Sequence, residues 1–504
     1  MRPLDPYDWI ASVARSDPSR LCLSDGDRRR VSYAEVDRTA GLHAAALAGL
    51  GVHPGDRVAV QVDKSIEAVF VYLACLRIGA VIVPLNTAYT AAELEYFLCD
   101  SEPRLLLTRP ENATGGAAPA CIRRTHVETL GTARDGSYAA RVAAETTPAP
   151  AAAVPESALA SLLYTSGTTG RSKGAMITRA NLLANAQALV ATWHMSAQDT
   201  LLHVLPLFHV HGLFLSLNVL FAAGGSVRLL QRFDPTETIR QLASASVFMG
   251  VPTHYTRLLS CPALTREAVA GMRLFVSGSA PLLAETHGAF EARTGKAILE
   301  RYGMTETLVN TSNPYFGLRK PGSVGLPLPG VELRIMDATR AEDGTEVGMI
   351  EIRGPHVCAG YWRAPEKTAT DRTADGFFRT GDLGMVDADG YLSIVARARD
   401  LVISGGLNVY PREVELELDA LPGVVESAVF GVPHPDLGEG VTAAITVSEG
   451  ATIDEITLVR ALRTRLAVYK VPKRILVVSE LPRNSMGKVQ KNRLREDHRD
   501  LYRR

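Results

Sequence analysis

Short apolar runs rich in β-branched residues alternate with helical stretches along the first part of the chain. "DRVAVQV" is followed by a helical stretch through Ala74 and by "AVIVPL", and the runs "SVFMGV" and "RLFVSGS" come later. Strands that alternate with helices predict a largely parallel sheet whose two faces are both covered. The sequence therefore indicates an α/β fold made of parallel-rich layers.

The pattern changes twice toward the C-terminus. After about residue 330, short strands and turns ("GMIEIRG", "GYLSIVA") predict a smaller β subdomain. From about residue 400, a helix that begins at Pro411 precedes two strands ("ESAVFGV", "GVTAAITV") and another helix over roughly 453–467. Because Pro favours the first helical turn, we expect a compact α+β unit here. A chain of 504 residues is also too long for one ordinary core.

Charge and hydropathy exclude several classes of partner. Lys plus Arg equals Asp plus Glu at 54 each, so no net field recruits nucleic acid or an anionic membrane. The most apolar run, roughly 66–85, is interrupted by Glu67, Arg77, Gly79 and Pro84. We interpret it as a buried helix and a buried strand rather than a membrane span.

The first residues and the cysteines indicate the cellular compartment. The start, "MRPLDPYDW", has no apolar core of a secretory signal. The six cysteines are scattered without a CxxC pair, which argues against a disulfide framework or a zinc site and fits a reducing environment. We expect a cytoplasmic protein that binds neither nucleic acid nor membrane and needs no obligate protein partner.

"YTSGTTGRSKGA", residues 164–175, is the strongest single motif. Its glycines let backbone N–H groups turn toward an anion, its Ser and Thr hydroxyls add donors, and Lys173 adds a positive charge. The spacing differs from the GxxxxGK[ST] of a P-loop, which disfavours a P-loop kinase. The alternative is a flexible Gly/Ser linker, but a helical stretch ("ANLLANAQALV") follows soon after the lysine. The preceding Ala/Pro segment, 146–158, is predicted to be a surface connection.

Five motifs occur in order along the chain: "YTSGTTGRSKGA", "YGMTET" (302–307), "TGD" (380–382), "ARARDLVISGG" (396–406) and "PRNSMGK" (482–488). Over about residues 25 to 495 the sequence resembles the adenylate-forming superfamily of acyl-CoA synthetases, adenylation domains and luciferases. The stretches "PLFHVHG", "MGVPTHYTRLL" and "VSGSAPLL" look most like those of the malonyl-CoA synthetases. The resemblance implies a large N-terminal domain, 1–398, and a small mobile C-terminal domain, 399–504.

The resemblance also implies a reaction in two halves. A carboxylate attacks the α-phosphate of ATP to give an acyl-adenylate and pyrophosphate, and the thiol of coenzyme A then displaces AMP. By resemblance, Thr305 donates to the α-phosphate and Glu306 binds Mg²⁺ through a carboxylate oxygen; the alternative for Glu306 is a surface carboxylate. The remaining positions assigned to the nucleotide and coenzyme A are Thr165, Ser166, Gly167, Thr168, Thr169, Gly170, Lys173, Gly278, Ser279, Ala280, Glu300, Tyr302, Gly303, Asp382, Arg397, Gly405 and Gly406.

Within that set the implied roles differ. Residues 165–173 resemble the pyrophosphate cradle, and 278–280 with Tyr302 bracket the adenine. Asp382 accepts from the ribose hydroxyls beside Arg397. Gly405 and Gly406 form part of the surface that the pantetheine thiol of coenzyme A approaches.

The C-terminal motifs imply domain movement. Lys488 resembles the lysine that reaches the active site and neutralises carboxylate and α-phosphate; by composition alone it is one solvated charge among many. The implied hinge is Arg399, where the family usually has Lys or Asp. Ala396 likewise stands where a glycine is common, so the hinge departs from the usual pattern.

Arg301, directly before Tyr302, selects the acid. Relatives that use bulky acids often have a small residue there, whereas a buried arginine needs an anionic partner. A short dicarboxylate provides one, because one end is activated and the other is held. The alternatives are a surface arginine or a pair with Glu300. Further candidates for the acid pocket are His209, Ser277, Arg257, Val210 and Met304. The support for a zinc site at His209 and His211 is weak, because no third ligand is near in sequence.

We therefore predict an ATP-dependent, AMP-forming ligase that joins malonate, and also methylmalonate, to coenzyme A, with Mg²⁺ as cofactor. The alternatives are the same chemistry on oxalate, succinate or propionate, or a free-standing adenylation enzyme that loads a carrier protein. A nucleotide-binding sensor is a further alternative, but Lys488 has a role only in chemistry.

Overall fold

The computed structural model describes residues 5–26, 28–89, 91–112, 125–165, 172–340, 346–404, 407–448, 453–466, 468–484 and 487–503. The chain divides into two compact units. Unit 1 comprises Met1–Glu332 and Ile352–Phe378, and unit 2 comprises Leu333–Glu351 and Arg379–Arg504.

Unit 1 contains a nine-stranded sheet whose central strands are parallel. The two edges are antiparallel, at β1/β2 and at β13/β14/β15. In spatial order the strands are β15 (Leu326–Pro327), β14 (Leu308–Ser312), β13 (Ile298–Met304), β12 (Leu274–Ser277), β11 (Val247–Gly250), β9 (Thr200–His203), β10 (Ser226–Leu229), β1 (Leu21–Asp25) and β2 (Arg29–Ser32).

A second, six-stranded sheet completes unit 1. All of its neighbouring strands are parallel except the last pair, β7/β8. In spatial order its strands are β6 (His126–Thr129), β5 (Leu105–Thr108), β3 (Arg57–Gln61), β4 (Val81–Pro84), β7 (Leu159–Thr165) and β8 (Lys173–Thr178). Central strands of both sheets are buried over most of their length, as expected for parallel sheets covered by helices.

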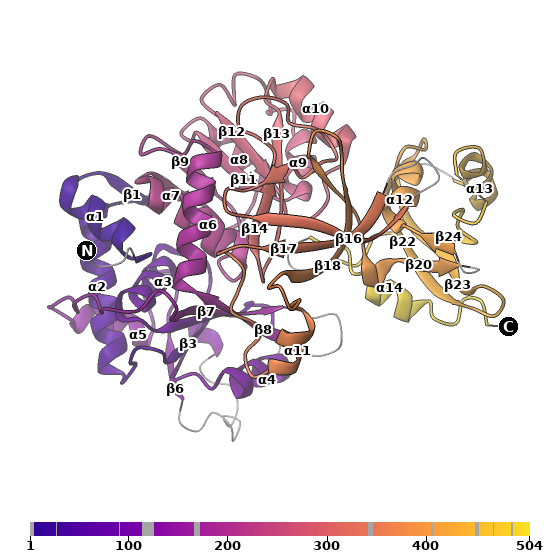
Figure 1. Ribbon diagram of the computed structural model, residues 1–504. Coiled ribbons are helices and arrows are strands. Elements are labelled where there is room, and N and C mark those ends of the chain that lie inside the picture. The colour runs from indigo at the N-terminus through magenta and orange to yellow at the C-terminus, as the bar shows by residue number, and fades with distance from the viewer. Residues whose placement is uncertain are drawn as a thin grey trace. The chain divides into compact units, whose positions relative to one another are not determined.

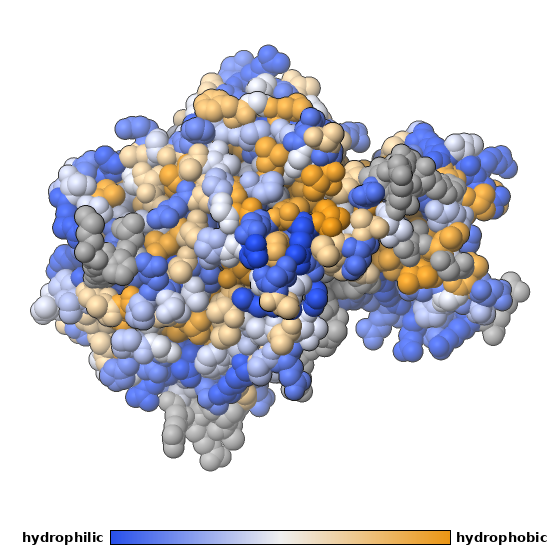
Figure 2. Space-filling view, in the orientation of Figure 1, coloured by the Kyte–Doolittle hydropathy of each residue, from blue (hydrophilic) through white to orange (hydrophobic). Residues whose placement is uncertain are grey.

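The helices of unit 1 cover these sheets (Figure 1), and α6 contacts β8 of one sheet and β14 of the other. Figure 2 shows hydrophilic and hydrophobic residues side by side over the visible face of the molecule. The helices are α1 (Asp8–Ser16), α2 (Tyr33–Gly49), α3 (Ile66–Ile78), α4 (Ala91–Ser101), α5 (Ser137–Ala144), α6 (Arg179–Thr192), α7 (Leu217–Ala223), α8 (Pro235–Leu242), α9 (Pro252–Leu259), α10 (Ala284–Thr294) and α11 (Pro365–Thr370), with a 3₁₀ turn η1 (Pro110–Asn112) and a π-helix η3 (His211–Ser216).

The apolar run at residues 66–85 forms a buried helix and strand, as predicted. The Ser65 side chain caps α3 by accepting from the backbone of Ala68, and Gly79 ends the helix in the left-handed conformation at φ 78°. The chain then enters β4, in which every residue is buried. Every described helix is too short or too polar to span a bilayer.

Aromatic packing fixes α9 and α10 against the nine-stranded sheet. The rings of Phe275 and Phe290 lie 4.9 Å apart, and Tyr255 meets Phe290 edge-on at 5.3 Å. The Tyr255 hydroxyl also donates to the carbonyl of Val276, at 2.7 Å. These contacts hold α9 beside the end of β12, where the candidate site lies.

Unit 2 contains two further sheets. The first holds β16 (Glu332–Arg340), β17 (Glu346–Arg353), β18 (Phe378–Val386) and β19 (Leu392–Arg397), in that order. The second runs β21 (Leu407–Val409), β20 (Val402–Ser404), β23 (Gly438–Val447) and β22 (Val424–His434), and β24 (Arg474–Val477) pairs in parallel with β23. The helices are α12 (Pro411–Asp419), α13 (Glu455–Arg463), α14 (Lys491–Asp497) and a 3₁₀ turn η4 (Ala398–Asp400).

These sheets and helices confirm the α/β prediction, with a β sheet after residue 330 and an α+β unit at the C-terminus. The predicted boundary between residues 398 and 399 stays a prediction, because the compact division puts the first of these two sheets with the C-terminal unit. Among the described residues Cys22, Cys75, Cys261 and Cys358 are free thiols, whereas Cys99 is disulfide-bonded, which the cysteine spacing did not indicate.

Candidate active site

Four neighbouring parallel strands, β13, β12, β11 and β9, end at the same edge of the nine-stranded sheet. In open α/β sheets this carboxyl edge is where ligands bind. Several residues predicted for the acid lie on or just after these strand ends. We define the acid cluster as Ser277, Gly278, Ser279, Arg301 and His211.

Arg301 on β13 is buried, with 5% of its surface exposed. Its Nε and Nη2 atoms are buried and have no hydrogen-bond partner among the described residues. Burial lowers the pKa of the guanidinium to about 10, and no carboxylate acts on it from nearby. The surface alternative for Arg301 is therefore excluded, and the pair with Glu300 is not formed.

The loop after β12 surrounds the Arg301 side chain. A Cβ atom added to Gly278 would lie 2.4 Å from the Arg301 Cζ atom, so the guanidinium packs directly against this glycine. The Ser277 hydroxyl is buried and has no hydrogen-bond partner within the described ranges. Ser279 adopts φ 72°, a left-handed conformation that non-glycine residues seldom adopt and that occurs often at binding sites.

His211 completes the acid cluster at the start of η3. Its Nδ1 atom lies 3.1 Å from the Ser279 hydroxyl, and its buried Nε2 atom has no hydrogen-bond partner among the residues that the structure describes. Burial, together with the charge of Arg301, lowers the pKa of His211 well below its usual value. The imidazole is therefore neutral at pH 7, and Arg301 is the cationic member of the cluster.

The "PLFHVHG" segment bends sharply into η3. A Cβ atom at Gly212 would lie 2.0 Å from the Pro206 carbonyl oxygen, so only glycine fits. His209 and Val210 are partly buried just before η3, and burial lowers the pKa of His209 to about 4. Isolated π-helical turns occur frequently at functional sites.

Helix α9 carries two further residues of the predicted pocket segment. The His254 ring stacks on Phe233 at 4.1 Å, and burial lowers its pKa to about 3. Arg257 is exposed on α9. A solvated guanidinium holds a ligand only weakly, so we leave Arg257 out of the acid site.

Several residues predicted for the nucleotide lie in the tight turn between β13 and β14. A Cβ atom at Gly303 would lie 1.8 Å from the Leu308 carbonyl oxygen, so the turn requires glycine. Glu306, 6% exposed, lies in this turn after Thr305. Its Oε1 atom accepts from the Tyr361 hydroxyl at 3.0 Å and from the Thr165 hydroxyl at 3.4 Å. Tyr302 is buried and Met304 is partly buried on the same strand.

The ends of the glycine-rich motif lie beside this turn. Thr165 and Lys173 face each other as the last pair of β7 and β8, and the Tyr96 hydroxyl donates to the Ser172 carbonyl at 2.6 Å. The intervening predictions for Ser166, Gly167, Thr168, Thr169 and Gly170 lie outside the described residues. The turn at Glu306 is therefore joined to the base of the glycine-rich motif.

Unit 2 carries the predicted ribose pair. Asp382 and Arg397 stand opposite each other on β18 and β19, and the Arg397 Nε atom lies 2.9 Å from Asp382 Oδ1. Asp382 is 2% exposed. The ion pair fixes the orientation of the Asp382 carboxylate, whose oxygens are hydrogen-bond acceptors.

Lys488 lies in a tight loop of unit 2. Its backbone N–H donates to the Asn484 side chain, at 2.9 Å, and its carbonyl accepts from the Asn484 N–H, also at 2.9 Å. Gly487 adopts φ 74°, which favours glycine before the lysine. Of Arg399 only the backbone is described, in η4, and Gly405 and Gly406 lie outside the described residues.

A cavity of about 280 Å³ lies in unit 1 between strand ends of the two sheets. The ring of Phe208 on its wall contacts that of His209 at 4.7 Å. The Lys64 ammonium donates to the His203 carbonyl at 2.7 Å, and burial lowers its pKa well below the usual value. The charged or polar lining residues are Asp63, Lys64, Thr87, Gln231 and Arg232.

A resident metal cage is not found among the described residues, because no three His, Cys, Asp or Glu side chains gather there. Mg²⁺ in nucleotide enzymes usually takes one or two carboxylates and completes its shell with phosphates and water. Glu306 alone beside the phosphate motif fits that pattern.

Sequence reasoning missed three contributors. Tyr361, which donates to Glu306, gave no recognisable signal in "CAGYWRAP". His211 was considered only as a zinc ligand, and Gly212 only as part of a motif. The tight "HG" pair after two apolar residues was the available signal for both.

Comparison with known proteins identifies the family. The model described as AMP-binding enzyme matches residues 10–362, and that of the AMP-binding enzyme C-terminal domain matches residues 413–488. ATP-bound MatB from Rhodopseudomonas palustris superposes with a TM-score of 0.94 at 50% identity, over 99% of this chain and 100% of that one.

Two curated relatives are less similar. A sulfoacetate–CoA ligase of Cupriavidus necator is 36% identical over 94% of this chain and 93% of its own length. The mitochondrial malonate–CoA ligase ACSF3 of Bos taurus is 36% identical over 89% of this chain and 82% of its own. Both domain matches and these identities confirm the predicted resemblance, and the chain belongs to the family of AMP-binding enzymes.

Proposed function

We propose that this protein is a malonyl-CoA synthetase, an AMP-forming acid–CoA ligase that uses ATP to join malonate to coenzyme A and that also accepts methylmalonate. Family membership supports the adenylation and thioester chemistry, with ATP and coenzyme A as substrates. The relative named for malonate, the mitochondrial ACSF3 of Bos taurus, supports the choice of acid.

The choice of malonate rests on one observation: Arg301 is buried, and its Nε and Nη2 atoms have no hydrogen-bond partner among the described residues. A buried guanidinium with two unsatisfied N–H-bearing atoms is costly unless an anion completes it. A carboxylate accepts two parallel hydrogen bonds from such a fork. The single carboxylate of a monocarboxylic acid is used in adenylation, so the guanidinium stays unpaired. Malonate has a second carboxylate that pairs with the guanidinium.

The acid cluster adds donors around the held end. The Ser277 hydroxyl and the His211 Nε2 atom are both buried, and neither has a hydrogen-bond partner in the part of the chain that the structure describes. With Nε2 protonated, the neutral His211 tautomer accepts from Ser279 at Nδ1 and donates to the acid. The held carboxylate thus receives neutral donors and one full charge, and the other carboxylate stays free to attack.

Adenylation then depends on the residues of the nucleotide side. The free carboxylate oxygen attacks the α-phosphorus of ATP, and pyrophosphate leaves. Thr305 donates to the α-phosphate, Lys173 compensates charge on the leaving phosphates, and Glu306, oriented by Tyr361, holds Mg²⁺. When bound, Mg²⁺ supplies charge compensation on the phosphate oxygens.

Unit 2 supplies the ribose and lysine contacts. Asp382 accepts from the ribose hydroxyls while Arg397 holds its orientation. The Lys488 ammonium draws the attacking carboxylate and the α-phosphate together. In the second half the coenzyme A thiol loses its proton and attacks the acyl carbonyl, AMP leaves, and the thioester forms. We propose that the thiol approaches through the cavity beside Phe208 and His209.

A second candidate acid is sulfoacetate, which a 36% identical relative is named for. Its sulfonate is an anion of similar size that also pairs with Arg301. Sulfonate is the weaker hydrogen-bond acceptor, so a guanidinium fork flanked by Ser277 and His211 favours the carboxylate. Sulfoacetate is therefore included as a direct competitor.

The proposal is tested by pyrophosphate exchange and thioester formation on malonate, methylmalonate, sulfoacetate, oxalate, succinate, acetate and propionate. We expect malonate to give the highest kcat/KM, and acetate and propionate to fall below it by at least about 10³-fold, because they leave buried donors unpaired. Equal turnover of a monocarboxylic acid contradicts the dicarboxylate assignment. Preference for sulfoacetate keeps the role of Arg301 and replaces the substrate.

A further inference from the structure

The contact between Gly278 and Arg301 sets the position of the guanidinium. A Cβ atom at Gly278 would lie 2.4 Å from Cζ, 2.6 Å from Nε and 2.8 Å from Nη1 of Arg301. All three nearest atoms belong to this one side chain. Ordinary contact begins near 3.4 Å, so an added methyl group displaces the guanidinium by about 1 Å (3.4 − 2.4 Å).

Gly278 is not needed for backbone conformation. Its φ lies outside the left-handed region, in contrast to that of the next residue, Ser279. An alanine is therefore compatible with the backbone at 278, and the three atoms that its Cβ would approach most closely all belong to Arg301. The absence of a side chain here leaves space for the Arg301 guanidinium.

The backbone of Arg301 has little freedom to yield. Strand β13 is paired on both sides, with Ser277 opposite Glu300 on β12 and Ser312 opposite Arg301 on β14. Among the described residues, the guanidinium has no hydrogen-bond partner at Nε or Nη2, and no carboxylate acts on it. Packing against Gly278 therefore orients the Nε and Nη2 atoms.

We propose that Gly278 is a specificity-determining residue: its missing side chain is the space that the Arg301 guanidinium occupies, and the two residues together set the depth of the acid pocket for a short dianionic acid. The proposal rests on the proposed function for the identity of the acid. It differs from the role implied for Gly278 by resemblance, which is contact with adenine.

The experiment is a cycle of four proteins: wild type, Gly278→Ala, Arg301→Gly and the double variant. We expect Gly278→Ala to lower kcat/KM for malonate by about 10²-fold, because a displacement of about 1 Å spoils a positioned contact. KM for ATP should stay within about twofold of wild type. In the Arg301→Gly background the same substitution should change propionate kcat/KM by less than about twofold. Gly288→Ala on α10, where an added Cβ meets no atom within 4 Å, is the matched control.

Three kinetic results overturn the proposal. One is unchanged malonate kinetics in Gly278→Ala. Another is a rise in KM for ATP that matches the loss on malonate, which assigns Gly278 to adenine. The third is an equal loss on propionate with and without Arg301.

Thermal unfolding of the same four proteins separates this proposal from the proposed function. We expect Gly278→Ala to lower Tm, or to fail to fold, and the double variant to regain the Tm of Arg301→Gly. A double variant that stays unfolded overturns the size pairing, because the methyl group then collides with something other than Arg301. If wild type uses no dianionic acid, the proposed function fails, but the Tm cycle still decides the pairing.

Discussion

At the scale of single residues, Arg301 combines a proposed functional role with a stability cost. It is buried, it lacks partners at Nε and Nη2, and its pKa falls to about 10 from an ordinary value of 12.5. A shift of this size corresponds to roughly 3 kcal/mol against the charged folded state. Because the guanidinium is charged in both folded and unfolded chains at pH 7, the free protein carries this cost, and an anionic substrate relieves it.

We therefore predict that Arg301→Met stabilises the substrate-free protein while abolishing use of malonate. Methionine fills the space without a buried charge, and apparent Tm should rise by a few degrees, about 2–4 °C per kcal/mol gained. Malonate should raise the Tm of wild type and leave that of the variant unchanged. Thermal unfolding with and without malonate checks both statements. A lower Tm in the variant would mean that the guanidinium makes stabilising contacts.

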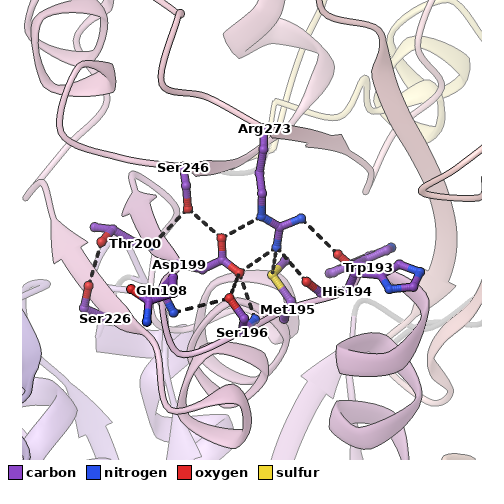
Figure 3. A network of polar contacts seen from close by, with 10 residues as sticks. All are labelled: Trp193, His194, Met195, Ser196, Gln198, Asp199, Thr200, Ser226, Ser246 and Arg273. Atoms are coloured by element: carbon purple, nitrogen blue, oxygen red, sulfur yellow. Dashed lines mark hydrogen bonds and ion pairs between the residues drawn. The ribbon is translucent and has the colours of Figure 1, made fainter.

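At the scale of elements, one polar network joins four parts of the nine-stranded layer. Arg273, just before β12, contacts Asp199, just before β9, through Nε at 2.6 Å and Nη2 at 2.7 Å. Figure 3 shows both residues facing each other, with Ser246 donating to the same carboxylate at 2.7 Å. Arg273 also donates to carbonyls at the end of α6, those of Trp193 and His194. The network ties the α6 terminus to the amino ends of the strands whose other ends form the acid edge.

We predict that Arg273→Ala destabilises unit 1 by about 2–4 kcal/mol, because it leaves the 3%-exposed Asp199 charge without its main partner. Arg240→Ala is the control, since Arg240 and Glu237 form an exposed pair worth at most about 1 kcal/mol. Denaturant unfolding of the two variants measures the difference. Equal effects would show that the network adds no more than a surface ion pair.

At the scale of the whole molecule, the two compact units carry different parts of the proposed chemistry. Unit 1 contains the acid cluster, the glycine-rich motif and Glu306. Unit 2 contains Asp382, Arg397 and Lys488. A reaction in two halves then permits a residue of unit 2 to act in one half alone.

For Lys488→Ala we predict loss of adenylate formation by at least about 10²-fold, with a smaller effect on thioester formation from a preformed malonyl-adenylate. The reason is that the lysine compensates charge only while carboxylate and phosphate approach. Pyrophosphate exchange measures the first half, and coenzyme A acylation from synthetic adenylate measures the second. Lys491→Ala on α14 is a nearby control; equal loss in both halves contradicts the assignment.

Buried histidines make the whole protein sensitive to acid. Burial lowers the pKa of His43 and His254 to about 3 and of His209 and His356 to about 4. In the unfolded chain the value is about 6.5. Between pH 6.5 and about 4 the unfolded state therefore binds more protons than the folded state. Stability from these groups is complete above pH 6.5 and falls as the pH drops through this window.

We predict a steady fall in Tm from pH 7 to pH 5. Each such histidine contributes up to about 1.4 kcal/mol per pH unit. His43→Phe, which keeps an aromatic ring beside Phe70 and Tyr138, should reduce the slope, and substitution of the exposed His53 by Asn should not. Thermal unfolding across this range checks the prediction. A flat profile would show that these imidazoles are protonated inside the fold.

Much of the fold followed from local pattern. Alternating apolar runs predicted β3, α3, β4, β11 and β12, and Pro411 marked the start of α12, because strand and helix periodicity are properties of neighbouring residues. The arrangement of the sheets could not be predicted from this local pattern. The division into two unit 1 sheets and the antiparallel β14 depend on which strands pair across long stretches of chain.

Five ordered motifs in the amino-acid sequence identify the family, and an arginine stands directly before Tyr302, where relatives that use bulky acids often have a small residue. Three features can be seen only in the folded chain: Arg301 is buried with no partner at Nε and Nη2 among the described residues, Gly278 makes room for it, and Tyr361 donates to Glu306. The physical reason is separation along the chain. A motif states which groups are available, but burial and hydrogen bonding depend on residues such as Thr165 and Glu306, 141 positions apart, which only packing brings together.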